Sequence, residues 1–295
     1  MAIPVEHERS AGASSRTQGR TAFLCVLGAL VVLAFWRILA GMYGSWFDEN
    51  AFMEHGILVV PAAAYMTWTM RERLRLIPSK PSAWGILLLV WGAIQALLGT
   101  AAHWVFVSRL AFLISLTGFI AVGWGLPMLR ALTYPLCTLL LMIAPPTFLF
   151  ERLTLSLQLL ASRLGETFLD ILGYSVLRDG NILELVGMRL SVEEACSGIR
   201  SLMAIIFLCT LYNFFFVEAR RVRTLILLLS IPIAILANAG RIVATGIASQ
   251  SNPALVTGTP HEVFGYISVA MAAIGCMLLH IGILYFEKLR RPRVS

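Results

Sequence analysis

Residues 220–247 read RRVRTLILLLSIPIAILANAGRIVATGI, and this stretch decides the fold class. Arginines stand at its start, and they are followed by a run of at least about 20 mostly apolar residues, the length that a helix needs to cross a membrane. Arg241 is the one charged residue within that apolar run, and it lies near the far end. The stretch therefore predicts a transmembrane helix over about 224–247 that begins at a basic loop.

The rest of the chain repeats this pattern. Of its 295 residues, 58% are hydrophobic and 13% are charged, whereas about a quarter of the residues in a soluble domain are charged. So few charges exclude a soluble nucleic-acid-binding protein, a disordered chain and a secreted disulfide scaffold. We predict an all-α polytopic membrane protein with about eight transmembrane helices, the other seven over roughly 21–43, 56–70, 83–101, 104–126, 131–150, 199–217 and 262–286.

The positions of the basic residues predict the orientation in the membrane. The formal net charge is +7, and 15 of the 23 Lys and Arg residues fall in the two tails and in alternate loops. Loops 44–55 and 248–261 contain none. Because cytoplasmic loops carry the excess of Lys and Arg, both termini are predicted to be cytoplasmic. The expected partner of the basic residues is therefore membrane lipid, and no nucleic acid is expected.

The spans define the predicted domain organisation. A membrane domain covers residues 21–286, between a flexible cytoplasmic tail at 1–20 and a basic cytoplasmic tail at 287–295. Within the membrane domain, residues 151–197 form a long extracytoplasmic insertion between two spans.

Two patterns divide this insertion. Its first half predicts an amphipathic helix at the membrane surface, because charged residues separate apolar ones that recur at helical spacing, namely Leu153, Leu157, Leu160, Leu164, Phe168 and Ile171. In its second half, turn signals at Asp179-Gly180 and Gly187 separate short alternating stretches. These stretches predict a β-hairpin or a three-stranded meander.

Cys196 is the one cysteine of the five that lies outside a predicted span. It stands just before the sixth predicted helix, where Ser191 and Glu194 have the spacing of a capping box. A helix N-terminus lowers the pKa of a thiol and favours the thiolate. Arg200, about one turn further on, is a cationic neighbour that can face the same way. Cys196 therefore fits a reactive thiol, although alone it also fits a small residue at the membrane interface.

Two further polar residues are predicted at the same membrane face. His261 lies in the first turn of the eighth predicted helix, where the helix dipole keeps an imidazole neutral. Arg241 lies in the outer third of the seventh, on one face with Asn238 and Thr245. Alone, His261 also fits an interfacial histidine, and Arg241 fits a side chain that reaches the lipid headgroups.

The order of the helices brings these groups to one layer. The sixth and eighth helices begin, and the seventh ends, on the same side of the membrane. Thiol, imidazole and guanidinium groups are the parts of a cysteine acyl-transfer site. In the first outer loop, His55 and the acidic residues beside it can orient a catalytic group or bind a basic substrate segment. A metal site of His55, His261, Cys196 and a carboxylate lacks a compact ligand motif, so we expect no metal and no other cofactor.

These residues resemble the motifs of a known family. Glu194–Leu202 is similar to the cysteine motif of the exosortases and archaeosortases, Asn238–Ile242 to their arginine motif, and His261–Gly265 to their histidine motif. Order and spacing also agree, and His55–Pro61 resembles the family's N-terminal motif. The resemblance covers roughly residues 40–285.

The resemblance implies a transpeptidase-like enzyme of the bacterial inner membrane, with Cys196 as nucleophile and Arg241 and His261 as its partners. It implies as substrates secreted proteins that end in a tripartite sorting signal: a short Pro-Glu-Pro-like motif, a membrane helix and a basic tail. Exopolysaccharide production often accompanies such systems.

From these observations we predict a cysteine protease or transpeptidase whose catalytic residues Cys196, Arg241 and His261 lie on the outer face, supported by Arg200, Asn238, Glu194 and His55. Two alternatives stay open. A non-catalytic exopolysaccharide transport or assembly protein needs polar residues along a pathway at mid-membrane, where this chain is almost wholly apolar. A membrane acyltransferase would use Cys196 on lipid-linked substrates.

Overall fold

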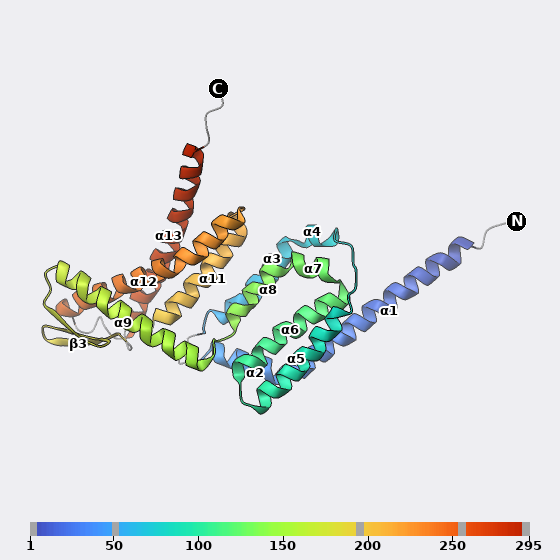
Figure 1. Cartoon of the computed structure of the whole chain (residues 1–295), viewed down its shortest axis with the longest axis horizontal. Coiled ribbons are helices and arrows are strands. Elements are labelled where there is room, and N and C mark those ends of the chain that lie inside the picture. Colours follow the sequence, from blue (N-terminus) through green and yellow to red (C-terminus); the bar gives the residue numbers. More distant parts are fainter. Residues whose placement is uncertain (1–4, 49–52, 193–197, 253–257, 291–295) are drawn as a thin grey trace, which may run out of the picture. The chain divides into compact units, whose positions relative to one another are not determined.

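The computed structural model describes residues 5–48, 53–192, 198–252 and 258–290, which are mainly helical (Figure 1). The chain forms two compact units. The first comprises Met1–Phe47 and Ala63–Ile143, and the second comprises Asp48–Ala62 and Ala144–Ser295. Every residue predicted for the site belongs to the second unit.

The first unit is built from helices alone in its described part. They are α1 (Val5–Ala34), α2 (Trp36–Trp46), α4 (Arg71–Arg75), α5 (Trp84–Ala101), α6 (Val105–Gly123), α7 (Leu126–Ala131), α8 (Thr133–Leu139) and the short 3-10 helix η2 (Leu140–Met142). Helix α3 (Gly56–Thr69) begins in the second unit and ends in the first.

The second unit contains the long helices that carry the site and one small sheet. Its helices are α9 (Thr147–Ile171), α11 (Gly198–Phe216), α12 (Arg220–Ser251) and α13 (Gly258–Arg290). Its strands are β1 (Val176–Asp179), β2 (Ile182–Leu185) and β3 (Met188–Ser191).

The predicted class of polytopic helical membrane protein is confirmed. Among the described residues, five helices are long and apolar enough to cross a membrane, namely α5, α6, α11, α12 and α13. The number rises to seven if each of two helix pairs with a short break counts as one span. The predicted number of eight is not confirmed, because α3 has only 14 residues and is therefore about 21 Å long, against about 30 Å of hydrocarbon.

The first predicted span differs from the structure at both ends. Helix α1 begins at Val5, so residues 5–20, predicted as part of a flexible tail, are helical and continuous with the apolar run. No proline interrupts the sequence from Val5 to Ala34. At Phe35 the helix bends, and the axes of Gln18–Ala34 and α2 differ by 59°.

The predicted span over 131–150 is not a single helix. Helix α8 and the 3-10 helix η2 end at Met142, and α9 begins at Thr147. Pro145 and Pro146 occupy the break. Because proline lacks an N–H and restricts the residue before it, the helical hydrogen-bond ladder cannot run through this pair.

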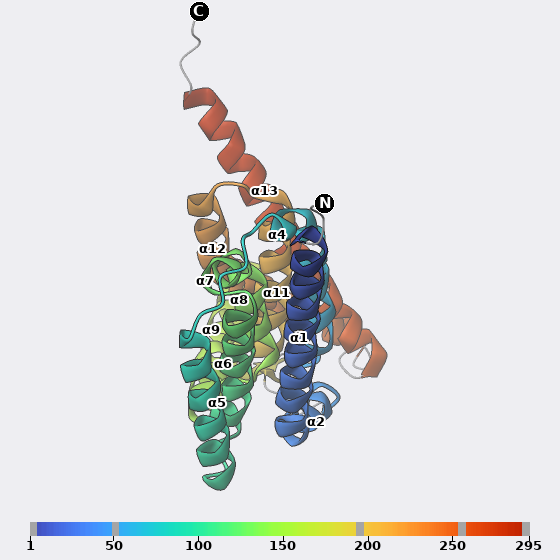
Figure 2. The ribbon, with the colours of Figure 1, turned by 90° about the vertical axis from the view of Figure 1, so that its right-hand side faces the viewer.

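Helices α5 and α6 form a closely packed antiparallel hairpin in the first unit, and they lie side by side in Figure 2. Glycines of α5 let the two backbones approach: a Cβ atom at Gly85 would lie 2.6 Å from the carbonyl oxygen of Gly118. At the other end of the hairpin, a Cβ atom at Gly99 would lie 2.7 Å from Ser108 Oγ. Small residues at the contact are the usual means of packing helices in a membrane.

The predicted meander is confirmed as a three-stranded antiparallel sheet in the order β1-β2-β3. Asp179 pairs with Ile182, and Leu185 pairs with Met188, so each turn has two central residues. Gly180 and Gly187 have φ values of +63° and +83°. Glycine adopts this left-handed conformation without strain, which explains the turn signals in the sequence.

Helix α9 confirms the predicted amphipathic helix and adds a second face. The leucine-rich face is exposed, with 41% of Leu160 and 73% of Ile171 accessible. The opposite face is buried and made mainly of small or polar residues, namely Gln158, Ala161, Ser162 and Gly165, together with Leu169. Apolar side chains are stable against lipid, whereas small residues permit close helix packing. Gly165 does so here, because a Cβ atom there would lie 2.8 Å from Ile242 Cγ2 of α12.

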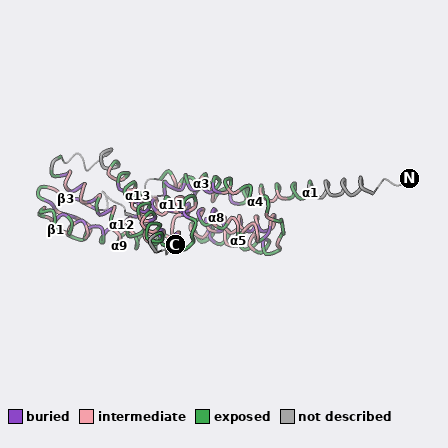
Figure 3. The backbone as a smooth tube through the Cα atoms, turned by 90° about the horizontal axis from the view of Figure 1, so that it is seen from above, coloured by how far each residue is buried: buried purple, intermediate pink, exposed green. Residues whose placement is uncertain are grey.

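The core of the second unit holds α12 from two sides. On one side, Ile242 packs with Ala161 of α9 and with sheet residues Leu183 and Leu190. On the other side, Ile226 and Ala234 of α12 pack with α11 and α13. Figure 3 shows buried stretches along α9, α12 and the strands. The segment of α12 that carries Arg241 is therefore fixed by packing.

Further contacts join α11 to α13. Cys209 of α11 and Cys276 of α13 pack in one buried cluster, and the Tyr212 hydroxyl lies 2.7 Å from His280 Nδ1. Because Tyr212 is half-buried and His280 is buried, this hydrogen bond forms in an apolar environment, where it is electrostatically stronger than in water. These contacts hold together the two helices that start at the candidate site.

Candidate active site

Several residues of the predicted site lie outside the described residues. Cys196 and Glu194 fall in the segment 193–197. The backbone of His261 lies in the first turn of α13, as predicted, but its side chain is outside the described part. The roles predicted for these three side chains therefore stay predictions.

Helix α12 places Arg241 against α13. A Cβ atom at Gly265 would lie 3.3 Å from both Cζ and Nη2 of Arg241 and 3.4 Å from Nη1. The guanidinium group therefore lies across the surface of α13 at a position without a side chain. His261 stands four residues before Gly265, about one helical turn earlier on α13. Arg241 of α12 and the first turns of α13 are thus brought together.

Asn238 and Thr245 share the inner face of α12 with Arg241. Their exposed fractions are 3% and 0%, so the predicted common face is confirmed and it points into the protein. The Oδ1 atom of Asn238 and the Oγ1 atom of Thr245 are buried without a hydrogen-bond partner. Ser268, three residues after Gly265 on α13, likewise buries its Oγ atom without a partner. Buried polar atoms are usually paired, so these oxygens mark a polar lining next to Arg241.

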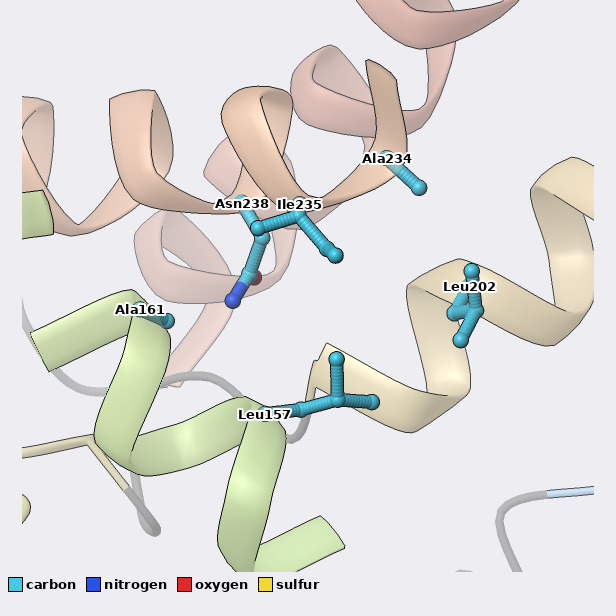
Figure 4. Close-up of a pocket in the computed structure, with 6 residues that line it drawn as sticks. All are labelled: Leu157, Ala161, Leu202, Ala234, Ile235 and Asn238. Carbon is cyan, nitrogen blue, oxygen red and sulfur yellow. The ribbon is translucent and has the colours of Figure 1, made fainter. Parts of the chain in front are cut away.

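A small pocket opens beside Asn238 between three helices. It contains about 230 Å³ of empty space, part of it open to the surroundings. Figure 4 shows the residues that line it, which are Leu157 and Ala161 of α9, Leu202 of α11, and Ala234, Ile235 and Asn238 of α12. The Asn238 carboxamide points from α12 toward α9. It is the one polar side chain in this lining.

Arg200 connects the start of α11 with the first predicted outer loop. Its Nη2 atom lies 3.3 Å from Glu54 Oε1. The neighbouring His55 is buried, and its ring lies 6.3 Å from that of Phe207 on α11. Both supporting residues are therefore at α11, although they are far apart in the sequence. Arg200 belongs to this helix, and His55 lies against its Phe207.

Sequence reasoning missed the specific partners in two of these contacts. Glu54 was recognised only as a member of an acidic cluster, and nothing in the sequence indicated that it pairs with Arg200. Gly265 was part of the quoted histidine motif, but its function as the surface that receives Arg241 was not predicted. A glycine one turn after a candidate catalytic residue is the signal that could have suggested a close approach.

Metal binding finds no support in the described part of the chain. Within it, no group of three or more His, Cys, Asp or Glu side chains lies close enough together to hold an ion. Cys196 and the imidazole of His261 are outside that part, so the expectation that the site holds no metal stays a prediction.

The fold and this site define a multi-pass helical membrane protein with a polar site built on α11, α12 and α13. The chain belongs to the transmembrane exosortase family, whose pattern matches residues 46–279, most of its length. Comparisons with curated protein sequences and with solved structures give no match. The matched range includes all residues of the candidate site, which confirms the resemblance seen in the sequence motifs.

Proposed function

We propose that this protein is a membrane cysteine peptidase or transpeptidase. The main support is the contact between the Arg241 guanidinium and α13 at Gly265, one turn from His261. It puts a fixed positive charge about one helical turn from the position of the predicted base. Membership of the exosortase family supports a sorting role for the same site.

The proposed reaction begins with the thiol of Cys196. His261 accepts the thiol proton, and the sulfur attacks the scissile carbonyl carbon of the substrate. The negative charge that develops on the carbonyl oxygen is stabilised by Arg241. As the C–N bond breaks, His261 gives its proton to the leaving amine. Water or an acceptor amine then attacks the thioester and releases Cys196.

The proposed substrates are secreted proteins with a C-terminal tripartite sorting signal. Cleavage would occur on the outer face of a bacterial inner membrane, with both protein termini in the cytoplasm. A link to exopolysaccharide production belongs to the same proposal, because it rests on what the family implies.

The nucleophile is tested by processing of a reporter protein that ends in a Pro-Glu-Pro-like motif, an apolar helix and a basic tail. Cys196→Ala should abolish cleavage, and Cys196→Ser should leave little, because a hydroxyl needs far stronger activation than a thiol. Alanine at Cys25, Cys137, Cys209 or Cys276 should be tolerated. Normal processing by a correctly inserted Cys196→Ala protein would rule out thiol catalysis.

The chemical species trapped on Cys196 separates this proposal from an acyltransferase. Mass spectrometry of the protein, quenched during turnover, should find the reporter peptide joined to Cys196 as a thioester. A lipid acyl chain at that position would instead favour the acyltransferase. A third outcome would favour the transport or assembly protein: Cys196 is never modified, although exopolysaccharide export requires the protein.

A further inference from the structure

The pocket beside Asn238 is built next to the candidate active site. Its wall on α12 includes Asn238, three residues before Arg241, and its wall on α11 includes Leu202, two residues after Arg200. All the other lining residues are apolar: Leu157, Ala161, Ala234 and Ile235. The pocket is therefore an apolar recess with one amide group, close to where the proposed chemistry takes place.

Asn238 combines a buried, unpaired amide oxygen with a position in the lining of a pocket. Its side chain is 97% buried, as its exposed fraction of 3% shows, and its Oδ1 atom has no hydrogen-bond partner. Burying an unpaired amide oxygen costs free energy. The carboxamide nevertheless points into the space between α12 and α9 (Figure 4). This arrangement fits a group that is kept for a ligand.

Asn213 on α11 provides a useful contrast. It is fully buried, and its Nδ2 atom donates a hydrogen bond of 3.0 Å to the carbonyl oxygen of Arg223. Its Oδ1 atom also lacks a partner, but Asn213 does not line the pocket. The amide of Asn213 joins α11 to the start of α12, whereas that of Asn238 faces a recess.

The chemistry of an intramembrane substrate indicates what this recess receives. A peptide that leaves a membrane helix to reach a nucleophile exposes backbone N–H and C=O groups, which are costly to leave unpaired in an apolar environment. A carboxamide has both a donor and an acceptor, so it can pair with one peptide unit. The recess is small, and five of its six lining residues are apolar, so it suits no more than one small apolar side chain.

We propose that Asn238 hydrogen-bonds a backbone peptide unit of the extended substrate next to the scissile bond, while one small apolar substrate side chain lies against the adjoining pocket. This inference rests on the proposed peptidase function and specifies how that site holds its substrate. Asn238 is then a substrate-binding residue that presents the scissile carbonyl to the nucleophile.

The test combines a side-chain change with a backbone change. The reporter is made with single ester bonds in place of amides around the cleavage point, each of which removes one N–H donor. In the wild-type enzyme, an ester at the paired position should raise the KM about tenfold, since a site built for a hydrogen bond discriminates against a ligand that lacks it. Asn238→Ala should raise the KM by a similar factor, and the same ester should then have no further effect.

Asn213→Ala is the matched control, because it also removes a buried carboxamide. It should leave the response to every ester unchanged, whatever its effect on protein levels. If each ester has the same effect in Asn238→Ala as in the wild type, Asn238 does not pair with the substrate backbone and the proposal is overturned.

Binding in the Cys196→Ala background separates this inference from the proposed function. The reporter carries a photo-crosslinker in its apolar helix, and crosslinking yield is measured against concentration. About tenfold weaker binding after the further change Asn238→Ala supports the subsite, whether or not the wild type cleaves the reporter. If the wild type cleaves nothing, the peptidase proposal alone fails. Equal binding with and without Asn238→Ala overturns the subsite, even if cleavage by the wild type is normal.

Discussion

The two arginines of the candidate site differ in what surrounds them. Arg241 places its guanidinium on α13 at Gly265, whereas Arg200 forms an ion pair with Glu54. Both ion-pair side chains are about half exposed, at 43% and 48%, and exposed pairs contribute little to stability, about 0–1 kcal/mol. We therefore propose a stabilising function toward a reacting oxyanion for Arg241, and a connecting function for Arg200.

The two arginines should respond differently to lysine. Arg241→Lys should process the reporter almost as poorly as Arg241→Ala, with a loss of about 100- to 1000-fold, the usual effect of removing one oxyanion donor. Lysine keeps the charge but loses the planar group that can donate two hydrogen bonds to one acceptor. Arg200→Lys keeps a cation for Glu54 and should retain most activity. Initial rates at equal membrane levels of protein measure both.

The reverse pattern would change the assignment. Near-normal cleavage by a well-expressed Arg241→Lys enzyme, beside an inactive Arg200→Lys enzyme, would transfer the electrostatic function to Arg200. It would also mean that Arg241 acts as a side chain that reaches the lipid headgroups, because lysine does this equally well.

The sequence predicted these residues better than their contacts. The i, i+3 and i+4 spacing was enough to put Asn238, Arg241 and Thr245 on one face, because helical geometry fixes it. The pair Glu54–Arg200 could not be predicted, since it depends on how a distant loop lies on α11. The turn glycines Gly180 and Gly187 were predictable because the requirement for positive φ is local.

At the scale of the helices, the position of Arg241 depends on how closely α12 approaches α13. A Cβ atom at Gly265 would lie 3.3 Å from the guanidinium carbon, so even alanine forces a small shift. The same helix has Gly282, where an added Cβ atom would meet nothing within 4 Å. These two glycines of α13 thus form a matched pair that separates the contact with Arg241 from general effects on the helix.

Gly265→Val should reduce processing by about 100-fold, the order of loss expected when a group is displaced by about 1 Å from its productive position. Gly265→Ala should have a smaller effect, because only one methyl group is added. Gly282→Val should remain near normal. Reporter cleavage is measured together with the amount of inserted protein. Wild-type rates for Gly265→Val would show that the guanidinium position on α13 is irrelevant to activity.

The boundaries of helices were harder to predict than their existence. The break at Pro145-Pro146 and the bend at Phe35 both fall within runs that hydropathy alone joined into one span. Hydropathy measures transfer into lipid and is insensitive to backbone geometry, whereas proline acts through the hydrogen-bond ladder. The small and polar face of α9 was missed for a related reason, because in a membrane the packed face is often not the most apolar one.

At the scale of the whole molecule, the orientation proposed for the site follows from its last three long helices. Each of α11, α12 and α13 is long enough to span the membrane, and consecutive spans alternate in direction. The start of α11, the end of α12 and the start of α13 therefore share one side, whatever the number of spans before them. Arg220, Arg221 and Arg223 stand at the opposite end of α12, and loop 248–261 contains no Lys or Arg. The positive-inside rule then predicts that the side on which α11 and α13 begin is the outer one.

Thiol labelling tests this orientation directly. A membrane-impermeant maleimide added to intact cells whose outer membrane has been opened should label Cys196 and none of the other four cysteines. Cys209 and Cys276 are buried. Cys25 and Cys137 are exposed on the protein surface, but they lie in apolar helices, so their expected neighbour is lipid, which a charged reagent does not enter. Single-cysteine variants identify the labelled site, and Cys196→Ala is the blank. Labelling of Cys196 only after the inner membrane is permeabilised would place the site in the cytoplasm, and cleavage of secreted proteins there would no longer be tenable.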